Sequence, residues 1–239
     1  MQAQYICEIR LREPVDPRSY LAELPAVKHL AENGLSLQRP ITILVGENGT
    51  GKSTLLEAVA VAYGFNAEGG TRNFDFATRE SHSDLYRHIA IARRAFPKDG
   101  FFLRAESLYN VATEIDNLGI TGAYGGVSLH EQSHGESVLS VLQNRFRGSS
   151  LYILDEPETA LSPMRILTLI AEIDRLVRAD SQFLIATHSP MLMAIPNAQI
   201  FHLSAEGVRE IPYTETEHFQ LAKSFLNNPE RILRILLKG

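Results

Sequence analysis

The chain has 239 residues, of which 44% are hydrophobic and 21% are charged, and its formal net charge is −5. This length and composition are typical of an ordinary globular protein with a sizeable core and exclude a disordered or fibrous chain. The acidic balance gives no global attraction to nucleic acid, so DNA could bind only through a local basic patch. We expect one domain over residues 1–239.

The single cysteine, Cys7, excludes an intrachain disulfide and a cysteine-based zinc site. Glu8, Arg10 and Arg12 interrupt the N-terminal stretch where a signal peptide needs an apolar core. No apolar run approaches the roughly 18 residues that span a bilayer. We therefore expect a cytoplasmic protein without membrane insertion.

The first half of the chain predicts a buried strand followed by a helix. Residues 1–40 read as strands and turns, with "YICEIRL" the clearest strand. Ile41–Val45 is a continuous apolar run typical of a strand buried on both faces, and Ser53–Tyr63 reads as a helix that ends at Gly64. Further on, "DLYRHIAIARRAF" reads as a helix, "GFFLRAE" as a strand and "NLGITGAYGGVS" as a loop.

The second half repeats the alternation of strand and helix. Leu151–Leu154 predicts a short buried strand, Ser162 and Pro163 begin a helix that runs to about Arg178, and Phe183–Thr187 predicts the next strand. "QIFHL" and "GVREIPY" read as edge strands, and two helices follow from about Glu215. Strands that alternate with helices predict an α/β fold with a mostly parallel sheet.

The loop after the first buried strand matches the Walker A pattern, G-x-x-x-x-G-K-[ST], in "GENGTGKS". Glycines allow consecutive backbone N–H groups to converge on a phosphate, and the helix N-terminus adds partial positive charge. Lys52 is expected to reach the β- and γ-phosphates, and the Ser53 hydroxyl to bind Mg²⁺. The predicted nucleotide contacts are Asn48, Gly49, Thr50, Gly51, Lys52, Ser53 and Thr54.

An acidic pair follows the later buried strand in "LYILDEPE". Asp155 stands at the carboxyl edge, where ligands of open α/β sheets bind, and is expected to hold Mg²⁺. Glu156 beside it is expected to orient and polarise the attacking water. The residues therefore predict an ATPase that uses ATP and Mg²⁺.

The segments "GENGTGKST", "LDEPETALS" and "ATHSP", in this order, resemble the Walker A, Walker B with D-loop, and switch-histidine segments of ABC-type ATPase domains. The resemblance is to the SMC/RecF-like branch and to small stand-alone bacterial ATPases. It implies a P-loop NTPase head with an antiparallel β N-terminal part and a helical signature subregion at about residues 75–148. It also implies that His188 contacts the γ-phosphate as a catalytic residue with Lys52 and Glu156, and that 159–162 form the D-loop.

The stretch "LHEQSHGES" admits two interpretations. His130, Glu131 and His134 match the H-E-x-x-H pattern of zinc peptidases, which needs both histidines on one face of an established helix. The flanking glycines and the lack of an apolar stripe disfavour that helix. Ser133 and Glu136 instead form an S-x-x-E capping box that would point free N–H groups at an anion.

Within the ABC resemblance the same stretch is the signature segment. Ser133 and Gly135 match that pattern and would bind the γ-phosphate, while His134 replaces a glycine. Glu106, after a strand, stands nearest to the Q-loop glutamine and is expected as a further metal ligand. Tyr20 is the candidate for stacking on adenine.

In the resembled family two chains enclose two ATP molecules, and the signature of one completes the Walker A site of the other. The resemblance thus implies a homodimer, or a heterodimer with a similar chain. Our hypothesis for its work is DNA repair or phage defence with an effector protein. A transporter energy subunit and a regulatory switch with little turnover are the alternatives. The chain has two weak basic patches, one in 87–98 and one at Arg231, Arg234 and Lys238. Nucleic acid is therefore a possible partner, but the acidic net charge disfavours tight binding.

Overall fold

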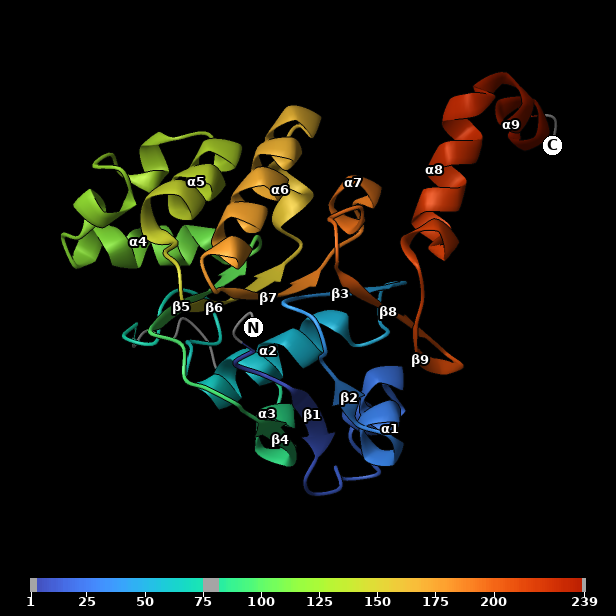
Figure 1. The fold of residues 1–239 in the computed structure, drawn as a ribbon, viewed down its shortest axis with the longest axis horizontal. Helices are drawn as coiled ribbons and strands as arrows, with labels where there is room; N and C mark the ends of the chain where they lie inside the picture. Colours follow the sequence, from blue (N-terminus) through green and yellow to red (C-terminus); the bar gives the residue numbers. More distant parts are fainter. Residues whose placement is uncertain (1–3, 75–81, 238–239) are drawn as a thin grey trace.

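The computed structural model describes residues 4–74 and 82–237, so the predicted start of the signature subregion, at residue 75, lies outside the described residues. A six-stranded sheet with the order β5-β6-β7-β3-β8-β9 forms its centre (Figure 1). Neighbouring strands are parallel except β9, which pairs antiparallel with β8. The strands are β3 (Ile41–Gly46), β5 (Asp99–Arg104), β6 (Ser150–Asp155), β7 (Gln182–Ala186), β8 (Gln199–Ser204) and β9 (Gly207–Glu210). This confirms the predicted α/β fold with a mostly parallel sheet.

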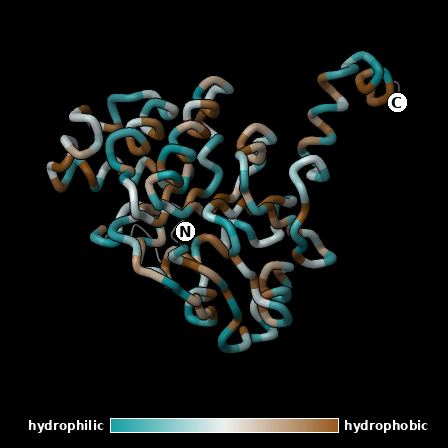
Figure 2. Tube along the Cα trace, viewed as in Figure 1, coloured by the Kyte–Doolittle hydropathy of each residue, from teal (hydrophilic) through white to brown (hydrophobic). Residues whose placement is uncertain are grey.

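Each face of the central sheet contributes to its own hydrophobic core. Along β3, Ile41, Ile43 and Val45 join one core and Leu44 joins the other, as the twofold alternation of a strand requires. Helices α4 to α7 cover the first face and α2 the second, and the strands between them are mainly hydrophobic (Figures 1 and 2). The helices are α2 (Lys52–Tyr63), α4 (Leu108–Asn117), α5 (His134–Ser140), α6 (Pro163–Arg178) and α7 (Pro190–Met193).

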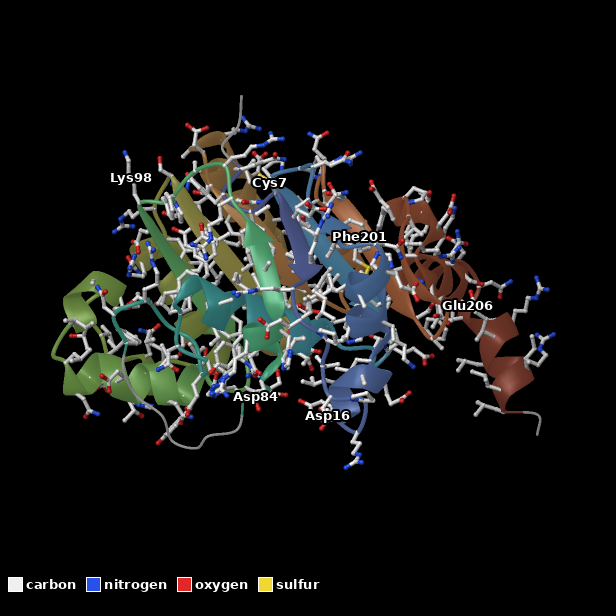
Figure 3. The ribbon with its side chains drawn as sticks, turned by 90° about the horizontal axis from the view of Figure 1, so that it is seen from below. Cys7, Asp16, Asp84, Lys98, Phe201 and Glu206 are labelled. Carbon is white, nitrogen blue, oxygen red and sulfur yellow. The ribbon has the colours of Figure 1, made fainter. Side chains whose placement is uncertain are left out.

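A smaller antiparallel sheet with the order β2-β1-β4 lies on the α2 side, and Figure 3 shows it from below with Cys7 beside it. It confirms the antiparallel N-terminal part, but the helix predicted for "DLYRHIAIARRAF" is wrong. Only α3 is helical there, and Ile89–Ala92 pairs with β1 because its alternating side chains suit a sheet edge. The elements on this side are β1 (Glu8–Leu11), η1 (Tyr20–Glu23), α1 (Pro25–Glu32), β2 (Leu35–Ser36), α3 (Leu85–His88) and β4 (Ile89–Ala92).

Two further differences concern helix α1 and strand β8. Residues 1–40 contain α1, which begins at Pro25 and buries Ala26, Val27 and Leu30 at helical spacing. The strand predicted from "QIFHL" exists, but it is not an edge strand, because β8 lies between β3 and β9. Of the two predicted edge strands, only β9 lies at an edge of the sheet.

Short helical turns connect the elements around α5 and α6. The stretch predicted as a loop at 117–128 includes η2, whose Tyr124 is buried in the core. The predicted signature helix continues beyond α5 as a π-helical turn. These segments are η2 (Thr121–Tyr124), η3 (Leu129–Glu131), η4 (Val141–Arg145) and η5 (Pro157–Ala160).

The C-terminal part confirms the two predicted helices. After η6 (Tyr213–Glu215) come α8 (Glu217–Asn227) and α9 (Pro229–Leu236), which extend away from the sheet (Figure 1). Neither helix contains a buried residue, and α9 carries hydrophobic segments at the free end (Figure 2). Within residues 4–74 and 82–237, no helix combines the length and apolar character needed to cross a membrane.

Candidate nucleotide-binding site

The loop between β3 and α2 has the backbone that a phosphate cradle requires. Gly46 has φ 143°, and a Cβ there would lie 2.1 Å from the carbonyl oxygen of Leu203 on β8. Gly49 and Gly51 have φ of 82° and 95°, in the left-handed region that favours glycine. Thr50 closes the turn by donating its hydroxyl to the Glu47 carbonyl at 2.8 Å. The sequence therefore needs its glycines at these positions for geometric reasons.

Lys52 begins α2 and is buried, with its ammonium turned into the loop. Its Nζ donates to the carbonyl oxygens of Gly46 at 2.7 Å and Glu47 at 2.9 Å. Burial lowers the pKa of Lys52, while the charges of Glu156 and Asp155 act in the opposite direction. The cation thus lies inside the cradle, where a phosphate would be its neighbour.

Ser53 joins the Walker A loop to the end of β6. Its hydroxyl donates to Asp155 Oδ1 at 2.9 Å, although β7 separates β3 from β6 in the sheet. Burial raises the pKa of Asp155 to about 6; hydrogen bonding from Ser53 and the charge of Arg104 oppose the increase, and Glu156 and Glu106 add to it. A buried carboxylate next to a hydroxyl offers the hard oxygen ligands that Mg²⁺ prefers.

Glu156 and His188 face each other across the ends of β6 and β7. Glu156 has φ 50°, a conformation that is unusual for a residue other than glycine and that is enriched at functional sites. Its Oε1 lies 3.5 Å from His188 Nε2, and both side chains remain partly exposed. The two predicted catalytic side chains therefore lie together, and His188 Nε2 itself is buried and has no hydrogen-bond partner among the described residues.

Glu158 is a residue of this site that the sequence reasoning missed. Its Oε1 accepts the Thr187 hydroxyl at 2.6 Å and the backbone N–H groups of His188 at 2.7 Å and Ser189 at 3.1 Å. The carboxylate thereby fixes the loop that carries His188. Its position three residues after Asp155, on the same loop, is the signal that could have identified it.

Arg104, at the end of β5, was also missed. Its guanidinium pairs with Glu57 at 2.7 Å and lies 3.7 Å from both Asp155 and Glu106. The β5–β6 register places Arg104 directly beside Asp155. A basic residue at the carboxyl end of a predicted strand was the available signal, because that edge carries the ligands of such sheets.

Two cavities adjoin these residues. A third cavity, of about 560 Å³, lies beside β8 and β9, and none of the predicted site residues lines it. The Walker B cavity measures about 340 Å³ and is lined by Ser53, Arg104, Ala105, Glu106, His134, Asp155, Glu156 and Thr159. The switch cavity measures about 470 Å³ and is lined by Gly46, Glu47, Asn48, His188, Glu217, His218 and Leu221.

The residues predicted as a zinc motif do not share a helix. His130 belongs to η3, Gln132 has an extended backbone conformation, and α5 begins only at His134. Across the part of the chain that the structure describes, no group of three or more His, Cys, Asp or Glu could hold a metal ion. The zinc-peptidase interpretation is therefore wrong in geometry.

The capping box of the predicted signature is formed. The Ser133 N–H donates to the Glu136 carboxylate at 3.0 Å, and Arg165 pairs with the same carboxylate at 3.1 Å. Hydrogen bonds from the Ser133 side chain and backbone lower the pKa of Glu136. A Cβ on Gly135 would lie 2.6 Å from the Ala160 carbonyl oxygen, so the signature helix packs tightly on the predicted D-loop.

The other predicted residues occupy different environments. Glu106 lines the Walker B cavity with an 88% exposed side chain, and its described partner is Arg104 rather than the Walker A serine. Thr54 lies in the first turn of α2, and Asn48 lines the switch cavity. Tyr20 lies in η1 and is 61% exposed.

The residues present fit Mg-ATP. The backbone at Gly49 has open space where a Cβ would stand, Lys52 supplies the cation, and Ser53 with Asp155 supplies oxygen ligands. These groups come from the β3–α2 loop, the first turn of α2 and the end of β6, which meet at one edge of the sheet. Their arrangement is that of a nucleotide-binding site.

Comparison with known proteins supports this interpretation. Residues 27–121 match a family model described as "AAA domain", and residues 120–194 match one described as "AAA domain, putative AbiEii toxin, Type IV TA system". No curated protein matches the sequence.

One solved structure is similar in fold, and a second one matches more weakly. One is described as a "putative metal-chelate type ABC transporter" in an inward-facing conformation; it is 14% identical, covers 91% of this chain and 88% of its own, and has a TM-score of 0.52. The other is an ATP-binding cassette of an ABC transporter, 15% identical over 87% of this chain and 91% of its own, with a TM-score of 0.47. The two family matches together cover residues 27–194 and, with the geometry of the P-loop, support an AAA-type ATPase domain, while the transporter structure supports the fold alone.

Proposed function

We propose that this chain hydrolyses Mg-ATP as the head of a dimer that encloses two nucleotides, and that it forms one domain over residues 1–239. The observation that supports this most directly is the hydrogen bond of 2.9 Å between Ser53 and Asp155, next to Glu156 and His188. It joins a phosphate cradle to an acidic strand end and a polar pair. Hydrolysis needs these three parts in contact.

Each side chain has a distinct role in this proposal. Lys52 neutralises the β- and γ-phosphates, and Ser53 and Asp155 hold Mg²⁺, with Glu106 at the rim as the weaker ligand. Glu156 takes the proton of the attacking water, and His188 donates a hydrogen bond to the γ-phosphate. Bound Mg-ATP supplies the phosphorus that water attacks and a metal that offsets the charge of the phosphates.

We infer that the signature acts on the partner chain. Ser133 and Gly135 lie at the N-terminus of α5, where the N–H groups of the first turn can bind an anion, although the Ser133 N–H and hydroxyl donate to Glu136 in this structure. A second copy would supply these groups to the γ-phosphate held by Lys52. Dimerisation would then depend on ATP.

The biological setting is part of the proposal. The description of the second family model names a putative toxin of a type IV toxin–antitoxin system, and we propose a role in phage defence with an effector protein. DNA repair is the related alternative. The basic stretch 87–98 offers little for DNA, because Arg87 lies near Asp84 and Arg93 lies 4.3 Å above the Tyr63 ring.

The test uses light scattering and phosphate release on wild type, Glu156→Gln and Lys52→Ala. We expect ATP-dependent dimers and phosphate release in the wild type, stable dimers without release in Glu156→Gln, and neither in Lys52→Ala. Mixing Lys52→Ala with Ser133→Ala should restore release, because one composite site in the mixed dimer keeps both wild-type halves.

The outcomes separate the alternatives. Dimers without phosphate release in the wild type would indicate a regulatory switch. ATP that changes neither mass nor phosphate release would contradict the proposal. Release by the wild type without any restoration in the mixture would contradict the trans arrangement alone.

A further inference from the structure

The switch histidine has a second histidine behind it. His218, the second residue of α8, places its Nε2 3.2 Å from His188 Nδ1, and the two ring centroids are 5.4 Å apart. On the opposite side of the same ring, His188 Nε2 faces Glu156 Oε1 at 3.5 Å. The His188 ring is therefore contacted at both nitrogen atoms, from two different elements.

We propose that His218 is a positioning residue that fixes the tautomer and orientation of His188 by donating its Nε2–H to His188 Nδ1. The inference rests on the ATPase function proposed above. His218 does not contact the reacting atoms in this scheme. It acts only through His188.

The direction of this hydrogen bond follows from the neighbours of His188. A neutral imidazole carries one proton, so one nitrogen donates and the other accepts. If Nδ1 carried the proton, the lone pair of Nε2 would face the carboxylate of Glu156 and the oxygens of a bound phosphate, which repel it. The proton therefore belongs on Nε2, and Nδ1 must accept.

His218 can supply the donor. Burial lowers the pKa of His218, and the charge of Lys52 acts in the same direction, while Glu217 acts in the opposite direction. A neutral His218 has one proton to place, and the close approach of His188 Nδ1 selects Nε2 for it. A neutral His218 also avoids a second cation close to Lys52.

The start of α8 is anchored to the core, and this anchoring holds His218 beside His188. Thr216 is fully buried and caps α8 by accepting the Phe219 N–H at 3.3 Å. This holds the first turn of α8 beside the P-loop, and Glu217, His218 and Leu221 line the switch cavity. Of the rest of α8, only Phe219 and Ala222 are half-buried and the other residues are exposed. His218 is the side chain of this helix that contacts the switch histidine.

The test compares His218→Ala, which removes the donor, with His218→Gln, whose side-chain amide can donate from nearly the same place. We expect kcat for ATP hydrolysis to fall roughly five- to tenfold in the alanine variant, with KM within about twofold of wild type. The glutamine variant should recover most of the loss. Lys223→Ala, on the same helix and away from His188, is the matched control and should behave as wild type.

A second readout observes the tautomer itself. The ¹⁵N spectrum of the histidine rings, assigned with a His188→Asn variant, should show His188 protonated at Nε2 in the wild type and in His218→Gln. In His218→Ala we expect a mixture of tautomers. This measurement needs no turnover and remains informative if a variant loses activity through instability.

The outcomes distinguish this inference from the proposed function. A wild type that releases no phosphate contradicts the ATPase proposal, and the ¹⁵N spectra then decide the inference alone. An active wild type with an unchanged His218→Ala variant overturns the inference. So does equal loss in the alanine and glutamine variants together with an unchanged His188 tautomer.

Discussion

Glu158 accepts the backbone N–H of His188 at 2.7 Å, so the loop after β6 holds the loop after β7. The same oxygen also accepts from Thr187 and Ser189. Three donors on one carboxylate oxygen leave the switch loop little freedom. The position of His188 is thus set by a residue that precedes it in the chain by 30 positions.

Replacing Glu158 with alanine should loosen this loop. We expect the free energy of unfolding to fall by about 2 kcal/mol, because donors that are partly buried lose a charged acceptor. Phosphate release should fall more than nucleotide binding. Urea unfolding and steady-state kinetics measure the two effects, and an Ala variant with wild-type kcat would contradict the assigned role.

Asp155 should make the metal-free protein less stable as the pH rises. Its pKa is raised to about 6 in the folded state by burial, so between about pH 4 and 6 the folded protein binds more protons than the unfolded chain. Stability therefore falls through this range, and the penalty is fully present above it.

The corresponding variant is Asp155→Asn. It should abolish phosphate release and yet raise the stability at pH 7 by about 1–3 kcal/mol, since a buried charge is removed. Thermal melts without metal at several pH values measure how the stability of each protein changes with pH. A variant with the same pH slope as wild type would show that another group causes it.

Gly135→Ala tests the packing of the signature helix on the predicted D-loop. The added Cβ would meet the Ala160 carbonyl oxygen and Arg165 Nη1, each at 2.6 Å. We expect the free energy of unfolding to fall by about 1 kcal/mol, because the clash outweighs the better helix propensity of alanine. Gly122→Ala, whose Cβ would meet nothing within 4 Å, is the control, and thermal melts with ATP-dependent dimerisation are the readouts.

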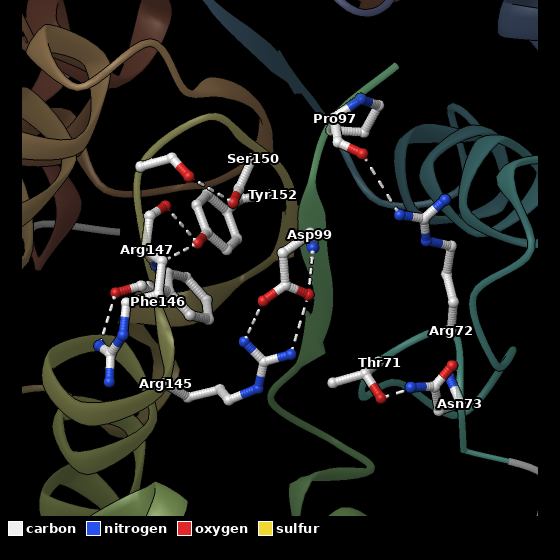
Figure 4. A network of polar contacts seen from close by, with 12 residues as sticks. Thr71, Arg72, Asn73, Pro97, Asp99, Arg145, Phe146, Arg147, Ser150 and Tyr152 are labelled. Carbon is white, nitrogen blue, oxygen red and sulfur yellow. Dashed lines mark hydrogen bonds and ion pairs between the residues drawn. The ribbon is translucent and has the colours of Figure 1, made fainter.

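The ion pair of Asp99 and Arg145 links β5 to the π-helical turn after α5 (Figure 4). Although burial alone would raise the pKa of Asp99, the hydrogen bonds from Arg145 and the Gly100 N–H lower it overall. Its contribution to stability is therefore present at neutral pH and is lost as the pH falls through the lowered pKa.

Asp99→Asn should lower the free energy of unfolding at pH 7 by about 1 kcal/mol, a value that allows for partial solvent screening of the ion pair. The loss of stability at acidic pH should also be smaller in this variant than in the wild type. Asp174→Asn removes a more exposed pair with Arg178 and should change little. Equal losses in the two variants would contradict the role of burial. Chemical unfolding at pH 3 to 7 provides the comparison.

Much of the fold was predictable because local signals agreed with the tertiary structure. The Walker A loop lies between a buried strand and a helix, and Ser162 caps α6 as its sequence indicates. The segment at 84–96 was misread because "IAIA" suits a helix face and a sheet edge equally until β1 is present to pair with it. Short apolar runs leave this choice to tertiary contacts.

The site was predictable only in part for the same reason. Lys52, Ser53, Asp155 and Glu156 stand in continuous motifs, but Arg104 acquires its role only through the β5–β6 register. His218 is about thirty residues from His188 and lies in a segment with no motif of its own. Residues that act through spatial neighbours leave no pattern along the chain.

The exposure of α8 and α9 bears on how the molecule opens. Neither helix buries a residue, while Thr216 at their base is fully buried. Backbone amides of these helices should therefore exchange with deuterium long before those of β3 or β6, because their opening exposes little apolar surface. His218 lies on the first turn of α8. If the amides of that turn exchange more slowly than those of the rest of α8 and of α9, the ATPase core ends at that turn, and the remainder of the two helices fluctuates independently.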